Sequence, residues 1–263
     1  IRNMKRSKRR ILGQHFLTNP EILDRIVEYG QLSESDIVLE VGAGRGELTK
    51  RIAEKAGKVI AVELDRELAE ELERNLSTYS NVEILIGDVL KLRPTGFNKV
   101  VSNPPYSISR KLLEWLMESR PKLMVLTLQR EFAAKLVAKP GSSKYLYISF
   151  LSNLLYEAEI KEIIPRSFFN PPPKVDSAIV LMNRKESAEK LEDDVKEIIK
   201  ALFTCRRQTL RHALRDLLKS GKEGESIFSK IPEEALSKRV FQLTPKELIE
   251  VAEIVAAGKA KPK

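Results

Sequence analysis

Small and acidic residues follow three apolar runs of this chain in an arrangement that could hold a nucleoside. The stretch EVGAGRGELT contains a G-x-G-x-G run made of Gly42, Gly44 and Gly46. Glycine lets the backbone approach a ligand closely, and a helix that begins behind it offers free N–H groups. The carboxylate of Glu63, in VELD, can accept both hydroxyls of a ribose, and that of Asp88, in GDVL, can accept from an adenine amine. Because the dinucleotide fingerprint needs its third glycine where this chain has Glu47, the pattern favours an adenosine-bearing ligand without a pyrophosphate.

A fourth candidate, Asn103-Pro104-Pro105-Tyr106, follows another apolar run in VVSNPPYSIS. By itself it is typical of a strand that ends in a proline-rich turn, because proline cannot donate to a strand ladder. The pattern Asn/Asp-Pro-Pro-Tyr/Phe also resembles the catalytic motif of amino-methyltransferases, which methylate exocyclic nitrogens with S-adenosylmethionine as donor. By that resemblance the Asn103 side-chain oxygen and the Pro104 carbonyl accept from the target amine, and Tyr106 stacks on the base. The donor is already a sulfonium cation, so positioning is expected to dominate the chemistry and no general base is needed.

These residues need a scaffold that brings strand ends together. Apolar runs occur at residues 36–44, 58–65, 82–89, 98–103 and 123–129, with helical patterns such as 67–76 between them. The alternation predicts an α/β fold, a mostly parallel, doubly wound, Rossmann-like sheet covered on both faces. Two further candidates, 157–165 and 175–183, flank a proline cluster and suggest an antiparallel hairpin at the sheet edge. A carboxylate at one strand end is often only a cap or a surface charge, but ligands bind where the carboxyl ends of parallel strands meet.

The strand pattern stops near residue 187. Residues 192–220 have the pattern of one continuous helix, and a break follows at 221–226. Thr244, Pro245 and Glu247 form a capping box that begins a final helix. We therefore expect a methyl-transfer domain with a basic arm at 1–186 and a small, all-helical domain at 187–263.

The net charge of +9 is concentrated in particular segments. Residues 1–10 contain six Lys or Arg and no acid, whereas residues 11–186 contain 24 charges of each sign. Such an arm is either a solvated tail or a contact for a polyanion, and a phosphate backbone is the obvious partner. A second basic set lies at i+4 spacing on the expected long helix, either as a solvated stripe or as an RNA contact. The residues predicted to bind RNA are Arg6, Lys8, Arg9 and Arg10 of the arm and Arg207, Arg211 and Arg215 of the helix, followed by Lys219.

The rest of the composition limits the class of protein. A single cysteine, Cys205, excludes an internal disulfide, and with only His15 and His212 beside it no zinc-type metal cluster is expected. A reducing cytoplasm is the compartment that this predicts. No apolar run approaches the ~18 residues of a membrane span, and the basic start is followed by no secretory segment. We expect a soluble, cytoplasmic protein without a membrane partner, and nothing in the sequence demands a second chain, so we expect a monomer.

The ordered set of motifs resembles the KsgA-type small-subunit rRNA adenine dimethyltransferases, a family with an archaeal and eukaryotic-like branch. The resemblance is carried by GQHFLTNP (13–20), LEVGAGRGELT, VELD, GDVL, SNPPYSIS, PRSFFNPPPKVDSAIV (165–180) and CRRQTLRHAL (205–214). It implies a class I methyltransferase fold, S-adenosyl-L-methionine as cofactor, and a pre-ribosomal small subunit as partner. The implied reaction transfers four methyl groups to the N6 atoms of two adjacent adenines in a hairpin loop near the 3′ end of the small-subunit rRNA.

The same resemblance assigns further roles. It places Gln14, His15 and Leu17 in a segment that closes over the cofactor, beside Asn103, and Phe169 in the wall of the target-base pocket. This chain departs from the family at two positions, since the family commonly has Asn at position 15 and Leu or Ile at position 104. Position 104 contributes mainly a backbone carbonyl, so the chemistry is expected to survive.

Three other functions share some of these features. The erythromycin-resistance methyltransferases modify a large-subunit rRNA adenine and have most of the motifs, but the C-terminal region favours the small subunit. A DNA adenine methyltransferase shares the tetrapeptide, although no segment here resembles a DNA-recognition domain. A non-catalytic ribosome-assembly or transcription factor could use the same fold, but the motifs are intact.

Overall fold

The protein is described here as a computed structural model, which covers residues 15–187, 190–218 and 222–259. Contacts divide the chain into two compact units, Ile1–Ala133 with Glu157–Arg184, and Ala134–Tyr156 with Lys185–Lys263. The last division point, between Arg184 and Lys185, lies close to residue 186, the boundary expected from the sequence. The segment 134–156 differs from that expectation because it groups with the C-terminal helices.

The first unit is built on a seven-stranded sheet with the order β4-β3-β2-β5-β6-β9-β7. Its strands are β2 (Ile37–Val41), β3 (Lys58–Glu63), β4 (Val82–Ile86), β5 (Lys99–Ser102), β6 (Leu123–Gln129), β7 (Tyr156–Ile164) and β9 (Ser177–Arg184). The first five are parallel, and β9 is antiparallel to β6. This confirms the predicted mostly parallel sheet with two added strands at one edge.

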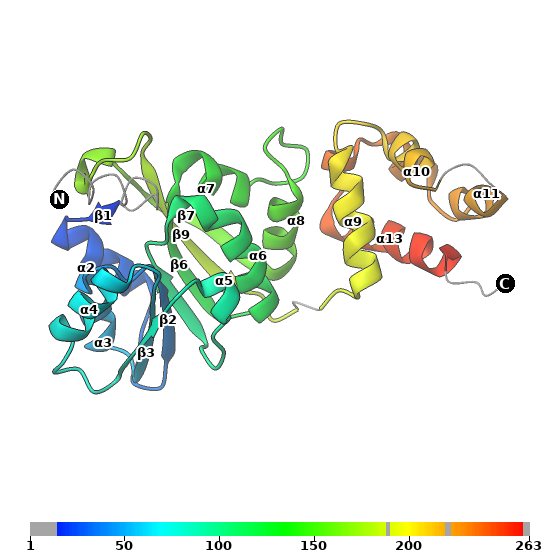
Figure 1. The fold of residues 1–263 in the computed structure, drawn as a ribbon. Helices are drawn as coiled ribbons and strands as arrows, with labels where there is room; N and C mark the ends of the chain where they lie inside the picture. Colours follow the sequence, from blue (N-terminus) through cyan, green and yellow to red (C-terminus); the bar gives the residue numbers. More distant parts are fainter. Residues whose placement is uncertain (1–14, 188–189, 219–221, 260–263) are drawn as a thin grey trace. The chain divides into compact units, whose positions relative to one another are not determined.

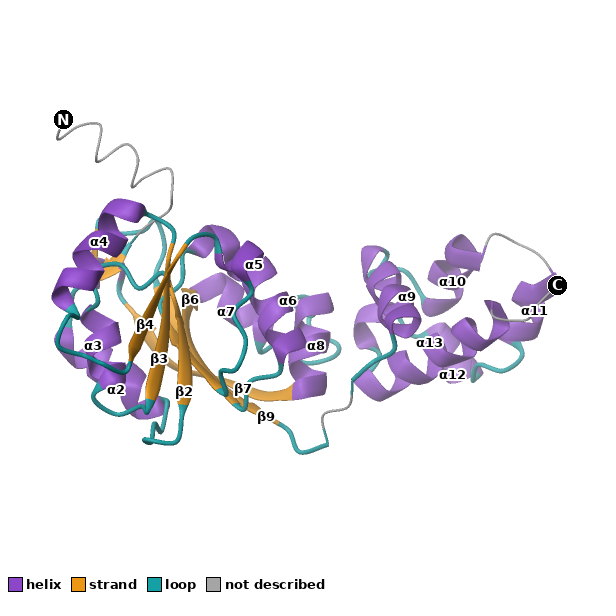
Figure 2. Ribbon diagram, turned by 60° about the horizontal axis from the view of Figure 1, so that its bottom comes forward, coloured by secondary structure: helices purple, strands orange, loops and turns teal. Residues whose placement is uncertain are grey.

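Helices cover both faces of this sheet. Those on one face are α2 (Pro20–Tyr29), α3 (Glu47–Ala53) and α4 (Arg66–Asn75), and α5 (Val89–Leu92) and α6 (Ser109–Ser119) lie on the other (Figures 1 and 2). Helix α2 shows why the sequence folds this way. Asn19 accepts from the N–H of Ile22 at 3.0 Å, Pro20 occupies the first turn, and Ile26, on the apolar face, is fully buried. Strand β5 is buried along its whole length and β6 up to Leu128, because both faces of the sheet are covered.

A two-stranded sheet joins segments that are far apart in the sequence. Strand β1 (Phe16–Leu17) pairs antiparallel with β8 (Phe169–Asn170), which lies in the loop between β7 and β9. The N–H of Thr18 also donates to the carbonyl of Phe168 at 2.9 Å. The segment that begins the described chain is thereby held against the proline-rich loop.

The second unit is helical. It contains α8 (Tyr147–Leu155), α9 (Asp193–Thr204), α10 (Leu210–Leu218), α11 (Lys222–Phe228), α12 (Glu233–Ser237) and α13 (Pro245–Lys259). The predicted capping box is present, because Thr244 N donates to Glu247 Oε2 at 2.8 Å and Glu247 N donates to Thr244 Oγ1 at 3.3 Å. In the part of the chain that the structure describes, no helix is long and apolar enough to cross a membrane.

The prediction of one helix over residues 192–220 is wrong. Helix α9 ends at Thr204, and the carbonyls of Arg206 and Gln208 accept from Phe241 N and Val240 N, each at 3.1 Å. These bonds hold residues 205–209 in a turn, so Arg207 lies outside α10 and not in helical register with Arg211. The predicted break at 221–226 is also wrong, because α11 begins there.

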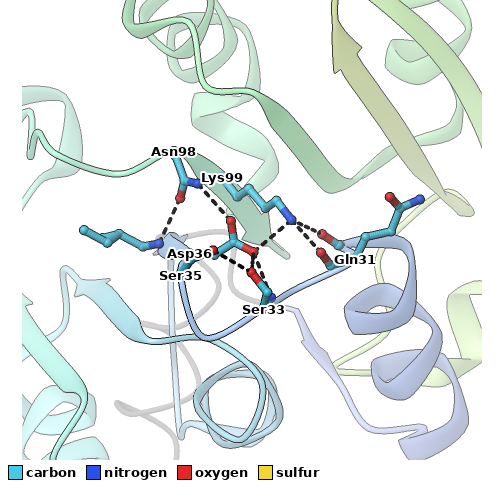
Figure 3. A network of polar contacts seen from close by, with 8 residues as sticks. Gln31, Ser33, Ser35, Asp36, Asn98 and Lys99 are labelled. Atoms are coloured by element: carbon cyan, nitrogen blue, oxygen red, sulfur yellow. Dashed lines mark hydrogen bonds and ion pairs between the residues drawn. The ribbon is translucent and has the colours of Figure 1, made fainter.

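A buried ion pair ties the loop before β2 to the start of β5 (Figure 3). Lys99 Nζ lies 2.9 Å from Asp36 Oδ2, and both side chains are less than a tenth exposed, at 8% and 6%. Lys99 also donates to the carbonyls of Gly30 and Gln31, at 3.2 and 2.5 Å. Burial alone would raise the pKa of Asp36, but hydrogen bonds from Lys99, Asn98 and Ser33 outweigh it and lower the pKa to about 2.

Asp36→Asn is expected to lower the free energy of unfolding at pH 7 by about 3 kcal/mol, because it leaves the Lys99 charge buried without its partner. The folded-state pKa is depressed, so the wild-type advantage is present above the ordinary pKa of 3.8 and is lost as the pH falls toward 2. Urea unfolding at pH 7, 4 and 2.5 checks this. Glu83→Gln, in the half-exposed pair with Lys58 at 2.7 Å, is the control and should cost less than about 1 kcal/mol. An equal cost for both variants, or a gap independent of pH, would contradict the prediction.

Candidate active site

A cavity of about 200 Å³ lies at the carboxyl ends of the parallel strands. Those of its lining residues that were predicted from the sequence are His15, Gly42, Glu63, Asp88, Asn103, Pro104 and Tyr106. They come from β1's flank, the glycine loop and the ends of β3, β4 and β5. The parallel register therefore brings together side chains that are up to 91 residues apart in the sequence.

A second cavity of about 400 Å³ adjoins the first and shares Phe16, Gly42 and Asn103 with it. Glu40 and Leu17 also line it, as do Asn170 and Pro171 of the proline-rich loop. Because they share these lining residues, the two cavities form one candidate site.

The glycine loop has no room for side chains. Gly42 has φ +75°, and a Cβ atom there would lie 3.0 Å from Pro105 Cδ. Gly44 has φ +60°, and its Cβ would lie 2.8 Å from Phe16 Cε1. Gly44 lines neither cavity; its N–H donates to Glu63 Oε2 at 2.9 Å, so this glycine positions the carboxylate.

The two predicted carboxylates are held in different ways. Glu63 is 3% exposed and accepts from Gly44 N and Asp65 N, both at 2.9 Å. Burial raises the pKa of Glu63 against the lowering effect of these backbone bonds. Asp88 Oδ1 accepts from Leu90 N at 3.0 Å, so Asp88 caps helix α5 and lines the cavity at the same time. Each carboxylate keeps acceptor capacity toward the cavity, because a carboxylate can accept about four hydrogen bonds.

The tetrapeptide is oriented by contacts at both ends. Asn103 Nδ2 donates to the carbonyl of His15 at 3.3 Å, and its Oδ1 accepts no hydrogen bond from the described residues. The hydroxyl of Tyr106 is bonded to Oγ of the fully buried Ser177 at 2.5 Å. Burial raises the pKa of Tyr106 to about 12, so its ring is a neutral stacking surface at physiological pH.

Two residues of the site were missed from the sequence. Phe16 lines both cavities and lies against the glycine loop. Glu40 is 2% exposed, and its Oε2 has no hydrogen-bond partner among the described residues. Burial raises the pKa of Glu40 to about 8. The available signal was an acidic residue within the otherwise apolar run before Gly42.

The remaining predicted residues that the structure describes do not line the first cavity. Leu17 belongs to the buried core and also lines the second cavity. Phe169, expected in the wall of the base pocket, is 3% exposed in that same core and lines neither cavity, because the β1–β8 pairing turns it inward. The predicted residues outside the described part of the chain are Arg6, Lys8, Arg9, Arg10, Gln14 and Lys219.

The predicted basic stripe of the second unit is divided. Arg207 and Arg215 are exposed. Arg211 instead forms an ion pair with Glu233 of α12. Of the three arginines predicted to bind RNA in this unit, only Arg211 is therefore paired with Glu233.

Glu63→Ala is expected to weaken S-adenosylmethionine binding by at least about tenfold, because bonds to a charged acceptor contribute about 1.5 to 3 kcal/mol each. Calorimetric titration of the folded variant measures this. Since Glu63 also anchors Gly44, Glu63→Gln is the matched variant: it keeps the side-chain length and should bind more tightly than the alanine variant. Wild-type affinity in both would remove Glu63 from the cofactor site.

Known proteins match this chain over most of its length. The family model described as "Ribosomal RNA adenine dimethylase" matches residues 5–256. A "Probable ribosomal RNA small subunit methyltransferase A" of Methanopyrus kandleri is 39% identical over 258 residues, 95% of this chain and 93% of the relative. That of Thermococcus gammatolerans is 41% identical over 246 residues, 92% of this chain and 87% of the relative.

Two solved structures resemble this one over nearly its full length. A dimethyladenosine transferase from Plasmodium falciparum has a TM-score of 0.84 at 29% identity and covers 93% of this chain and 98% of its own. The 23S rRNA methyltransferase ErmE has a TM-score of 0.66 at 26% identity and covers 92% of this chain and 99% of its own.

Proposed function

The chain belongs to the ribosomal RNA adenine dimethylase family, and from this premise we propose that its acceptors are two adjacent adenines of the small-subunit rRNA. It is an S-adenosylmethionine-dependent methyltransferase. The proposed acceptor atoms are the N6 amines in the 3′-terminal hairpin loop of a pre-ribosomal small subunit. The observation that carries the proposal is that Asn103, Pro104 and Tyr106 line the same cavity as the acidic strand ends, with the Asn103 amide anchored through its Nδ2.

The residues of the site fit the cofactor. Glu63 suits the ribose hydroxyls, and Asp88 suits the adenine amine. Gly42 lines the same cavity, and because it has no side chain a ligand can approach its backbone closely. The Oε2 atom of Glu40, which has no hydrogen-bond partner in the described part of the chain, suits the ammonium group of the methionine part. When bound, S-adenosylmethionine supplies an electrophilic methyl group on a sulfonium.

The chain's own residues hold and prepare the amine. An adenine amine is a poor nucleophile because its lone pair is delocalised into the ring. Hydrogen bonds to Asn103 Oδ1 and the Pro104 carbonyl draw the nitrogen toward tetrahedral geometry and free that lone pair for in-line attack. Tyr106 holds the base by stacking, and Ser177 holds Tyr106.

The small-subunit assignment rests on the family relatives and on the C-terminal helices. Relatives at 39 to 41% identity carry the small-subunit name, and the dimethyladenosine transferase structure has the higher TM-score of the two structures compared. We further infer a cytoplasmic location, in keeping with a single cysteine, and a monomeric state, as expected from the sequence.

Methyl incorporation into isolated, under-methylated small subunits tests the function. The enzyme is incubated with labelled S-adenosylmethionine and either small or large subunits, and the modified base is mapped. Label on the two adjacent adenines of the small-subunit hairpin is the expected result. Label on a large-subunit adenine would support the erythromycin-resistance type instead, and the absence of label on both subunits would support a non-catalytic assembly factor.

RNA binding is proposed for the basic arm and for Arg207 and Arg215. Arg207→Gln with Arg215→Gln should reduce the slope of log affinity against log salt concentration by about 1.4 to 1.8, since each lost phosphate contact removes about 0.7 to 0.9. Filter binding to small subunits over a salt series measures the slope. Arg211→Gln is the matched comparison and should change it less, because Glu233 already neutralises that side chain. An unaltered slope in the double variant would mean that both arginines face solvent.

A further inference from the structure

The imidazole of His15 lies on the ring of Tyr106. The two ring centroids are 5.7 Å apart, and the planes are inclined by 27°. His15 Nδ1 donates to the carbonyl of Pro171 at 2.8 Å; a carbonyl oxygen only accepts, so this nitrogen carries the hydrogen. One face of Tyr106 is therefore covered by a ring that the proline-rich loop helps to hold in place.

The main chain at His15 is fixed by separate contacts. Phe16 and Leu17 form β1, which is paired with β8, and Thr18 donates from N and Oγ1 to the carbonyl of Phe168 at 2.9 and 3.0 Å. None of these bonds involves the imidazole. The side chain of His15 can therefore turn off Tyr106 about its own bonds while β1 stays paired.

The acceptor base needs the same space. In the proposed function its amine lies at Asn103 Oδ1 and its ring stacks on Tyr106. His15, Asn103 and Tyr106 line the same cavity, so the face of Tyr106 that a base in this cavity reaches is the one that His15 covers. Atoms in stacking contact lie about 3.5 to 4.0 Å apart, so a base between the two rings needs about 7 to 8 Å. The rings are only 5.7 Å apart, which means that imidazole and base cannot share this face.

We propose that the imidazole of His15 occupies the position of the acceptor adenine: it covers the stacking face of Tyr106 and leaves it when the base enters. This inference rests on the proposed function. His15 is then a positioning residue that keeps the Tyr106 ring covered until a stronger stacking partner displaces it. A purine has a larger stacking surface than an imidazole or a pyrimidine, so the competition favours the correct acceptor.

Two variants of His15 separate its ring from its hydrogen bond. His15→Asn keeps a side-chain N–H donor for Pro171 and removes the ring, whereas His15→Phe keeps a ring and removes the donor. Single-turnover methyl transfer to under-methylated small subunits gives an efficiency, the saturating rate constant divided by the half-saturating subunit concentration. His15→Asn is expected to raise this efficiency about two- to tenfold, and His15→Phe is expected not to raise it. A merely structural role would lower the efficiency of both.

Thr18→Ala is the matched control, because it removes a hydrogen bond of the same segment and keeps the imidazole. An unchanged or lower efficiency in His15→Asn overturns the inference, and so does an equal rise in Thr18→Ala. A rise accompanied by equally tightened S-adenosylmethionine binding in calorimetry also overturns it, because the effect then belongs to the cofactor cavity. Tyr106→Ala, measured in parallel, separates this inference from the proposed function. Wild-type efficiency in Tyr106→Ala would contradict the assignment of Tyr106 to the acceptor base. A reduced efficiency in Tyr106→Ala together with an unchanged efficiency in His15→Asn would contradict only the role inferred for His15.

Discussion

Asn103→Ala is expected to lower the saturating single-turnover rate of methyl transfer by about 100- to 1,000-fold, the cost of removing one group aimed at transition-state charge. The Oδ1 acceptor matters most as the amine nitrogen gains positive charge. Interactions confined to the transition state change the rate constant and not the binding of substrate. The half-saturating concentration of small subunits should therefore stay within about threefold of the wild-type value.

The structure refines the choice of controls for this variant. The Asn103 amide also donates to the carbonyl of His15, so alanine removes an anchor of the β1 segment as well as the acceptor. Asn103→Asp keeps the acceptor oxygens and loses the donor, and the sequence pattern itself admits Asp at this position. It should retain much more activity than the alanine variant. A near-normal rate for Asn103→Ala would show that the Pro104 carbonyl suffices and that the assignment of the tetrapeptide is wrong.

Tyr106→Ala is expected to reduce the single-turnover efficiency by about 5- to 150-fold, because stacking on an aromatic side chain contributes about 1 to 3 kcal/mol per base. Stacking is present before the reaction, so the loss should be divided between capture of the extruded adenine and the rate of transfer. A fluorescent adenine analogue at the acceptor position of a hairpin RNA reports capture directly. It should stay largely stacked in the RNA when mixed with this variant.

Tyr106→Phe separates the ring from the hydroxyl. The ring keeps its stacking face, and most of the activity should remain. The hydroxyl of Ser177, fully buried on β9, loses its partner, which should lower the free energy of unfolding by about 1 to 3 kcal/mol. If Tyr106→Phe were as inactive as Tyr106→Ala, the hydroxyl would be the functional group and stacking would not explain the motif.

The sheet and the carboxyl-end site could be predicted from the sequence because their signals are local. A fully covered parallel strand must be apolar along its length, and each such run was visible between helical patterns. Given parallel strands, the residues that follow them share one edge, which is why Gly42, Glu63, Asp88 and Asn103 came together as expected. The capping box at Thr244 was equally local and is present.

The features that could not be predicted depend on partners far away in the chain. Strand β1 exists only because Phe16 and Leu17 meet Asn170 and Phe169, and this pairing also turns Phe169 into the core. The helical pattern across 192–220 was interrupted because hydrogen bonds from residues 240 and 241 outweigh the local preference for helix.

By itself, the sequence determined the fold class, the edge of the sheet at which the site lies and the residue types that line it, since these follow from periodicity and strand direction. The tertiary structure decided the state of each group. Arg211 lies against a counter-charge, Glu40 is buried with one oxygen that no described residue hydrogen-bonds, and the imidazole of His15 covers Tyr106. Each of these depends on which side chains from distant segments share a small volume, and burial and pairing in that volume set charge and accessibility.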